Sequence, residues 1–110
     1  MRILQFRTQE QINHILKMEK NSEIKLTVRR GSKWNIDKEQ IHIENAFTKE
    51  SITFGDIVYT KLKKFSECRD EILSSHFMFL TYKSVLKHLK EVYENFSEDE
   101  IVTLVYFKTV

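Results

Sequence analysis

The clearest alternation of apolar and polar residues lies in residues 24–30, where every second side chain is apolar. Successive side chains of a strand project to opposite faces, so this segment is predicted to be a strand with one buried face. The apolar face consists of Ile24, Leu26 and Val28. The opposite face consists of Lys25, Thr27 and Arg29, and we expect it to contact water or a ligand. Residues 31–39 then form a polar loop.

Four further segments are predicted to be strands. Residues 1–6, 40–46 and 51–65 are rich in β-branched and aromatic residues or alternate in polarity. Gly55 and Asp56 interrupt the third of these segments, as a bulge or as a tight turn between two strands. The fourth is an apolar run that is too short for most helices. Because its part from Ile101 to Phe107 is apolar on both faces, we expect a central strand there.

Apolar residues at helical spacing predict helices elsewhere in the chain. Residues 8–20 follow a capping-box pattern at Thr8 and Gln11, with Ile12, Ile15 and Leu16 on one face. One or two short helical turns are expected in residues 66–77, capped by Ser66. The clearest helix covers residues 81–96. Its apolar stripe consists of Tyr82, Val85, Leu86, Leu89, Val92, Tyr93 and Phe96.

The order of these elements, β-α-β-β-β-α-β, predicts an α+β fold, because strands outnumber helices and do not alternate regularly with them. The 110 residues suffice for one domain with one modest core. A small, strongly bent sheet or barrel covered by helices is the expected architecture. We expect the helix at 81–96 to pack on it through Leu86, Leu89, Val92 and Tyr93.

Composition limits the function classes. The formal net charge is only +2, so an argument for nucleic-acid binding has to come from local clusters of charge. No apolar run approaches the roughly 18 residues of a membrane span, and the N-terminal segment lacks the continuous apolar centre of a secretory signal. The lone cysteine, Cys68, cannot form an internal disulfide, which favours a reducing, cytoplasmic location.

Most residues with catalytic or metal-binding chemistry are isolated in the sequence. The four histidines fall on different predicted elements without ligand spacing, so we expect neither a metal nor a cofactor. Cys68 has no evident histidine partner and is interpreted as a structural cysteine. A basic run in the third strand segment is interpreted as the solvated face of an edge strand rather than a phosphate site. Its members are Lys61, Lys63 and Lys64.

The polar face of residues 24–30 and the loop after it form the best candidate site. In sequence order the candidate residues are Lys25, Thr27, Arg29, Arg30, Lys33 and Trp34. Guanidinium groups suit phosphate oxygens, and an indole ring suits stacking on a base. The alternative is an exposed strand whose arginines pair with carboxylates and whose tryptophan fills the edge of a core. The residue types alone leave both interpretations open.

Three segments resemble the ASCH family, whose small domains are related in fold to PUA domains. They are the T-x-R-R-G pattern at 27–31, the FSE sequence at 65–67 and residues 86–107. The resemblance covers nearly the whole chain. It implies that residues 1–110 form one PUA-like β-barrel of about five to six strands with helices covering its ends. It also implies a basic cleft for RNA, single-stranded nucleic acid, a nucleotide or a modified nucleoside.

Some ASCH proteins are amidohydrolases that remove the acetyl group of N(4)-acetylcytidine, and they share a K-x-x-T-x-R pattern and a later glutamate. Thr27 and Arg29 match the threonine and the arginine, and Glu67 matches the glutamate. Ile24 stands at the position of the lysine. Lys25 lies one position later, and Lys20 lies four residues earlier. A threonine hydroxyl is a poor nucleophile without a base, so binding ranks above hydrolysis.

Three functions therefore follow from the sequence as hypotheses. The first is recognition of RNA, a nucleotide or a modified nucleoside, and the second is deacetylation of N(4)-acetylcytidine by Thr27, Glu67 and Lys25 or Lys20. The third is a protein-interaction module. The site hypothesis expects Ile24, Leu26 and Val28 to be buried. It also expects Thr27 and Arg29 to point into a concave cleft that Glu67 lines, with Lys33 and Trp34 at its rim.

Overall fold

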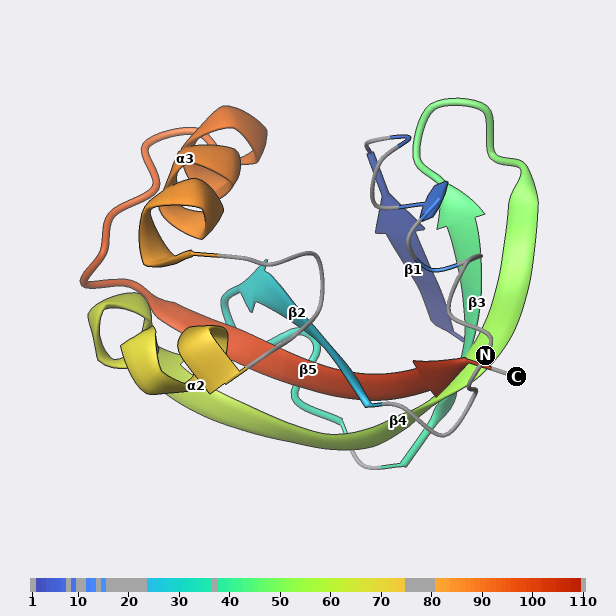
Figure 1. Ribbon diagram of the computed structural model, residues 1–110, viewed down its shortest axis with the longest axis horizontal. Helices are drawn as coiled ribbons and strands as arrows, with labels where there is room; N and C mark the ends of the chain where they lie inside the picture. Colours follow the sequence, from blue (N-terminus) through green and yellow to red (C-terminus); the bar gives the residue numbers. More distant parts are fainter. Residues whose placement is uncertain are drawn as a thin grey trace.

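A five-stranded sheet in the order β1-β3-β4-β5-β2 forms the centre of the computed structural model (Figure 1). The structure describes residues 2–7, 9, 12, 13, 15, 24–36, 38–74 and 81–109. The strands are β1 (Arg2–Phe6), β2 (Lys25–Arg30), β3 (Gln40–Asn45), β4 (Ser51–Lys64) and β5 (Ile101–Thr109). The 3-10 turn η1 (Phe65–Glu67) and helix α2 (Arg69–Ser74) follow β4, and helix α3 (Tyr82–Val92) precedes β5. The predicted α+β class is confirmed.

The sheet curls strongly, so that its two edge strands approach each other. In a flat sheet β1 and β2 would lie about 19 Å apart, because neighbouring strands are spaced by about 4.8 Å. Instead, Arg29 Nη2 on β2 donates a hydrogen bond of 2.9 Å to the Gln5 carbonyl oxygen on β1. The rings of Phe6 on β1 and Phe107 on β5 are likewise only 6.0 Å apart. The sheet is thus a half-barrel, as Figure 1 shows, in keeping with the predicted bent sheet or barrel.

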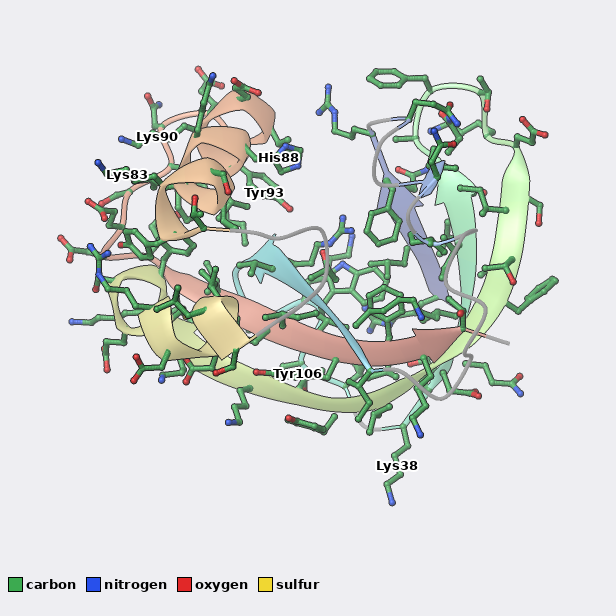
Figure 2. The ribbon with its side chains drawn as sticks, viewed as in Figure 1. Lys38, Lys83, His88, Lys90, Tyr93 and Tyr106 are labelled. Atoms are coloured by element: carbon green, nitrogen blue, oxygen red, sulfur yellow. The ribbon has the colours of Figure 1, made fainter. Side chains whose placement is uncertain are left out.

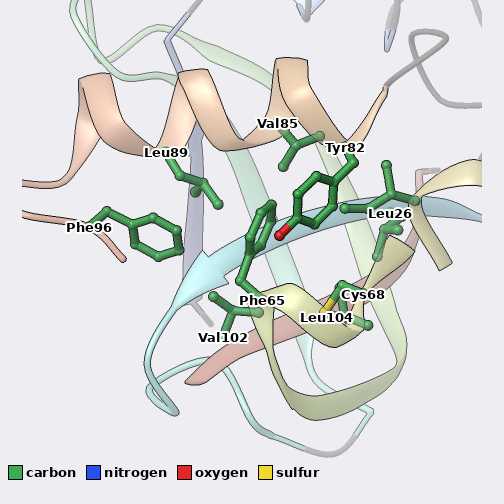
Figure 3. Close-up of a cluster of buried hydrophobic side chains, with 10 residues drawn as sticks. Leu26, Phe65, Cys68, Tyr82, Val85, Leu89, Phe96, Val102 and Leu104 are labelled. Carbon is green, nitrogen blue, oxygen red and sulfur yellow. The ribbon is translucent and has the colours of Figure 1, made fainter. Parts of the chain in front are cut away.

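Each face of the sheet supports its own apolar core. The core inside the curl, called here the concave core, consists of Leu4, Phe6, Ile12, Ile15, Ile41, Ile43, Ile57, Val105 and Phe107. The other, called the helix-covered core, lies between the sheet, η1, α2 and α3 (Figure 3). Its members are Leu26, Phe65, Cys68, Ile72, Tyr82, Val85, Leu89, Phe96, Val102 and Leu104. The sequence analysis had expected a single core.

Strand β5 contributes to both cores, which confirms the prediction that it is a central strand. It pairs with β4 on one side and with β2 on the other, both antiparallel. Val102 and Leu104 enter the helix-covered core, whereas Val105 and Phe107 enter the concave core. A strand covered on both faces has to be apolar on both, and the sequence of β5 meets that requirement.

Gly55 does not interrupt β4, so both predictions made for it, a bulge or a tight turn, are wrong. The strand is continuous from Ser51 to Lys64, and the irregular pairing with β5 falls between Ile57 and Tyr59. Glycine is required at position 55 for another reason. A Cβ atom there would lie 2.4 Å from the carbonyl oxygen of Lys108 on β5, closer than any real contact.

Helix α3 is shorter than predicted but begins where expected. The Thr81 side chain caps it by accepting a hydrogen bond from the Ser84 amide, and the Ser84 side chain caps the Thr81 amide in return. The helix ends at Val92, so residues 93–96 are not helical. Leu89 and Val85 are nevertheless buried, and Leu86 and Tyr93 pack against the same core, as predicted. Phe96 is also buried, from the loop that follows the helix.

The short helical turns predicted in residues 66–77 are present as η1 and α2, and residues 75–77 lie outside the described residues. Ser66 was predicted to cap these turns, but it lies inside η1 and does not cap α2. Near the N-terminus, Gln9, Ile12, Asn13 and Ile15 are helical, and both isoleucines are buried as expected. The predicted roles of Thr8, Gln11, Leu16 and Lys20 fall outside the described residues. Within the described parts of the chain, no helix has the length and apolarity to cross a membrane.

Candidate functional site

Strand β2 carries the sequence-predicted site, and its pairing decides which way each side chain points. Leu26 is buried in the helix-covered core, which confirms its predicted burial, whereas Val28 packs against that core and is only partly buried. Ile24 contradicts the prediction, because 49% of it is exposed. The reason is that pairing with β5 begins only at Lys25, opposite Phe107, which leaves Ile24 just outside the sheet.

Lys25 lies on the concave side and is completely buried. Its Nζ donates a hydrogen bond of 3.2 Å to Oγ1 of Thr109, the last residue of β5. The polar face of β2 was expected to contact water or a ligand, and this expectation is wrong at Lys25, which is completely buried. A flat sheet would have left this face open, but the curl brings it inside the half-barrel. Thr27 is on the same face as Lys25 and is half-buried.

Arg29 is the third residue of that face, and it bridges the two edges of the sheet. Besides its bond to the Gln5 carbonyl, its guanidinium carbon lies 5.2 Å from the centre of the Phe6 ring. The Nε atom is buried and has no hydrogen-bond partner among the described residues. No carboxylate of the described residues forms an ion pair with it. Burial lowers the pKa of Arg29, and the nearby Tyr93 hydroxyl partly opposes that shift.

His88 of α3 and Tyr93, which directly follows α3, both interact electrostatically with Arg29. Figure 2 shows His88 and Tyr93 extending from the helix toward β1, above β2. The pKa of the half-buried His88 is lowered, first by burial and then by the positive charge of Arg29. Arg7, which follows β1, lowers it further, whereas Glu91 raises it. The charges that act on His88 thus include Arg29 of β2 and Arg7, whose guanidinium carbon lies 5.3 Å from the centre of the Phe47 ring.

Arg30 points the opposite way from Arg29 and belongs to the other face of the sheet. Its Nε donates a hydrogen bond of 2.6 Å to Glu100 Oε1, in an ion pair that is partly exposed. Its Nη1 donates a second bond, of 3.0 Å, to the Glu94 carbonyl oxygen. This arginine has a carboxylate partner in the protein, as the alternative interpretation of the sequence required.

Lys33 and Trp34 are also kept apart from Arg29. Lys33 is exposed, and its carbonyl accepts a hydrogen bond of 2.8 Å from Arg2 at the start of β1. Trp34 packs against the concave core, and the Arg2 guanidinium lies 5.7 Å from its ring centre. Arg29 contacts the end of β1, about 10 Å farther along the strand. Trp34 therefore fills the edge of a core.

Glu67 is not brought to Thr27, which contradicts the expectation that both residues line one cleft. Glu67 is exposed at the end of η1, a turn that is anchored by Phe65 in the helix-covered core together with Leu26. Thr27 projects from the opposite face of the same strand. The packing of Phe65 decides the position of the FSE segment, and the sequence pattern gave no information about which face it would cover.

The remaining candidates have structural partners. Cys68 is buried and its Sγ donates to the Lys64 carbonyl oxygen at 3.3 Å. Burial raises the pKa of this thiol to about 11, in keeping with a structural cysteine. Lys63 forms an ion pair of 2.6 Å with Glu71. In the described part of the chain, β4 beyond Asp56 pairs only with β5, so its lysines do lie on an open strand segment.

The sequence analysis missed His88 and Arg7 and assigned Tyr93 only to the core. The available signal was weak: His88 lies three residues after Val85, beside the apolar stripe of α3 rather than opposite it. The interaction of His88 with charges on distant segments could not be read from periodicity. Comparison of the chain with protein-family models, with curated proteins and with solved structures found no match. The chemistry of the concave side therefore has to be argued from its own side chains.

Proposed function

We propose that this domain binds a nucleotide, free or within single-stranded RNA, through an anionic contact to Arg29 on the concave side of the sheet. One observation carries the proposal. Arg29 is a half-buried residue whose guanidinium Nε atom is buried and has no hydrogen-bond partner among the described residues. Buried charged groups are normally paired, because removing an unpaired ion from water is costly. A phosphate would supply both the missing charge and the missing acceptor.

The surroundings of Arg29 favour an anion over a neutral ligand. Arg29 and Arg7 both lower the pKa of His88 through their positive charge, so the electrostatic surroundings of Arg29 are cationic or can become so. A guanidinium presents several N–H donors in a fixed plane, which suits bidentate hydrogen bonds to phosphate oxygens. The bond to Gln5 occupies only Nη2 of Arg29. Its Nε is still available for an acceptor from a ligand.

A purely structural role for Arg29 is the competing explanation. The hydrogen bond to Gln5 and the contact with the Phe6 ring join the two edge strands and help to close the half-barrel. That role alone leaves the buried Nε without an acceptor, whereas anion binding accounts for it. The two roles predict different consequences of mutation, since a structural arginine affects unfolding and a binding arginine affects affinity.

The decisive experiment is a titration of the protein with single-stranded RNA and with cytidine 5′-monophosphate at several salt concentrations. We expect affinity to fall as salt rises, because phosphate neutralisation releases counterions. Arg29→Met should reduce affinity by about tenfold or more, in the range of a charge-assisted contact. Arg30→Met is the matched control and should change affinity by less than about twofold, since Arg30 pairs with Glu100 on the other face. Absence of salt-sensitive binding to RNA, single-stranded DNA and nucleotides would overturn the proposal.

Deacetylation of N(4)-acetylcytidine is the second candidate function, and one observation favours it. Lys25 and Thr27 share the concave face, so a potential base and a potential nucleophile lie on one side of β2. The position of Glu67 weighs against it, because the turn η1 that carries this exposed residue packs on the other side of the sheet through Phe65. A chromatographic assay for cytidine release, comparing wild type with Thr27→Ala, tests this function. Turnover that depends on Thr27 would make hydrolysis the primary function.

A further inference from the structure

A stacked pair of tyrosines lies on the helix-covered face of the sheet, away from Arg29. Tyr59 on β4 is paired with Tyr106 on β5, and the ring centres are 4.2 Å apart with an angle of 14° between the planes. Tyr106 packs against the helix-covered core, so both rings project from that face and not from the concave side. The helices leave this part of the face open, since 42% of Tyr59 is exposed. The outer surface of the Tyr59 ring is therefore accessible to a ligand.

Two lysines flank the tyrosines on the same face. Lys61 is two residues beyond Tyr59, and Lys108 is two residues beyond Tyr106. Alternate residues of a strand share a face and lie about 6.6 Å apart, so each lysine adjoins one of the rings. Neither lysine forms a hydrogen bond or an ion pair of 4.0 Å or less with another described residue. The four residues Tyr59, Tyr106, Lys61 and Lys108 are called here the tyrosine patch.

The carboxylates near the patch do not cancel its positive charge. Asp56 lies opposite Lys108 in the pairing of β4 with β5. Glu71 on α2 is already held by Lys63 in an ion pair of 2.6 Å, although the charge of Lys61 acts on it as well. Three lysines thus lie near two carboxylates, which leaves the surface around the rings cationic.

A second stacked pair on the same face provides an internal comparison. Phe54 on β4 is 49% exposed, and its ring centre lies 4.9 Å from that of His42 on β3. His42 alternates with Ile41 and Ile43 of the concave core, so this pair also projects from the helix-covered face. The residue two positions beyond Phe54 is Asp56, an acid. Exposed aromatic rings therefore occur at both places, but only the tyrosine pair is flanked by lysines.

We propose that the tyrosine patch binds single-stranded RNA, with one base stacked on Tyr59 and the neighbouring phosphates on Lys61 and Lys108. Aromatic rings beside cationic side chains are the combination with which proteins hold single strands without reading their sequence. A second copy of the chain is a poorer occupant, because a two-fold contact would repeat the same lysines on both sides. The patch goes beyond the proposed function, since it lies on the face opposite to Arg29 and does not need the Arg29 site.

The affinity of fluorescein-labelled octauridylate, measured by fluorescence anisotropy, tests the proposal. The measurements use Arg29→Met, in which the first site is disabled. Adding Tyr59→Leu should lower the remaining affinity by at least about fivefold, because the stacking of one base is lost. Adding Phe54→Leu is the matched control and should change affinity by less than about twofold. The affinity of wild type for cytidine 5′-monophosphate should not respond to Tyr59→Leu.

The lysines allow a second comparison on the same strand. Lys61→Gln should reduce the slope of log affinity against log salt by about 0.7, the value for one phosphate contact to a single strand. Lys64→Gln removes the same charge from the other face, because Lys64 lies opposite Ile101 and is an odd number of residues from Lys61. It should leave the slope nearly unchanged. Should Tyr59→Leu fail to fold, ultraviolet crosslinking of wild type to octauridylate containing 5-bromouracil replaces it. The crosslink should map to Tyr59 or Tyr106.

The outcomes separate this proposal from the proposed function. Equal effects of Tyr59→Leu and Phe54→Leu, or crosslinks only at other residues, overturn the tyrosine patch. So does self-association in sedimentation experiments that is lost in Tyr59→Leu, because a second copy would then be the occupant. RNA binding that disappears entirely in Arg29→Met overturns the patch and leaves the proposed function standing. Binding of octauridylate that depends on Tyr59 but not on Arg29, without binding of cytidine 5′-monophosphate, supports the patch and overturns the proposed function.

Discussion

Arg29 and Arg30 are adjacent in the sequence, carry the same side chain, and have opposite environments. Both are half-buried, but Arg30 pairs with Glu100 at 2.6 Å, whereas Arg29 bonds to a backbone carbonyl, has no described carboxylate partner and has a buried Nε without a hydrogen bond. Because they are neighbours in a strand, they must project to opposite faces. The curl of the sheet then makes one face the inside of a half-barrel. The same side chain therefore serves structural pairing on one face and is available to a ligand on the other.

The two faces of β2 differ in the same way along the rest of the strand. Leu26 and Val28 join the helix-covered core, where η1, α2 and α3 exclude water. Lys25 and Thr27 face the interior of the curl beside Val105 and Phe107 of β5. We expect substitutions on the first face to affect mainly stability and substitutions on the second to affect mainly binding.

The largest expected effect is on the helix-covered face. Leu26→Ala should lower the free energy of unfolding by about 2–5 kcal/mol, because it removes a fully packed side chain and leaves a cavity. Chemical denaturation measures this loss, and the affinity of the folded fraction for RNA should be unchanged. A decrease in the free energy of unfolding of less than about 1 kcal/mol would show that Leu26 is not tightly packed beneath the helices.

The next effect concerns Arg29, and it should appear in binding rather than in stability. Arg29→Met replaces a half-buried charge that has no carboxylate partner among the described residues with an apolar side chain of similar length. We expect the free energy of unfolding to change by less than about 1 kcal/mol while affinity falls by about tenfold or more. A stability loss above about 2 kcal/mol with unchanged affinity would instead make Arg29 a structural bridge between β1 and β2.

Arg30 should show a smaller effect, and one that depends on pH. The hydrogen bond from Arg30 lowers the pKa of Glu100, so the ionised form of Glu100 is favoured in the folded protein. The stability that this pair contributes is present above the pKa of an ordinary glutamate and is lost as pH falls through the lowered value. Arg30→Met should therefore reduce the acid sensitivity of unfolding, measured as the denaturation midpoint between about pH 3 and pH 7. An unchanged profile would contradict the pairing.

The smallest effect is expected from His88 in the absence of ligand. Because its pKa is lowered in the folded state, the unfolded chain binds more protons just below about pH 6.5. Stability should consequently rise with pH in that window, and His88→Gln should remove this part of the rise. Thermal unfolding of wild type and His88→Gln at several pH values measures this change.

The sequence alone determined much of the secondary structure, because local backbone geometry fixes those patterns. Alternation in residues 24–30 predicted that Leu26 and Lys25 lie on opposite faces, and the apolar run at 101–107 predicted a central strand. Thr81 marked the start of α3. Each of these predictions depends on residues that are close together in the chain.

Only the tertiary structure decided which polar side chains lie near one another. Lys25 is buried and Arg29 reaches β1 because the sheet curls, and the curl results from contacts between distant residues such as Phe6 and Phe107. Glu67 lies on the other side of the sheet because Phe65 packs into the helix-covered core. Periodicity gives the face on which a side chain lies, but it contains no information about which distant segment covers that face. The packing of the two cores therefore brought Arg29 to the end of β1, and it placed the turn that carries Glu67 on the face opposite to Thr27.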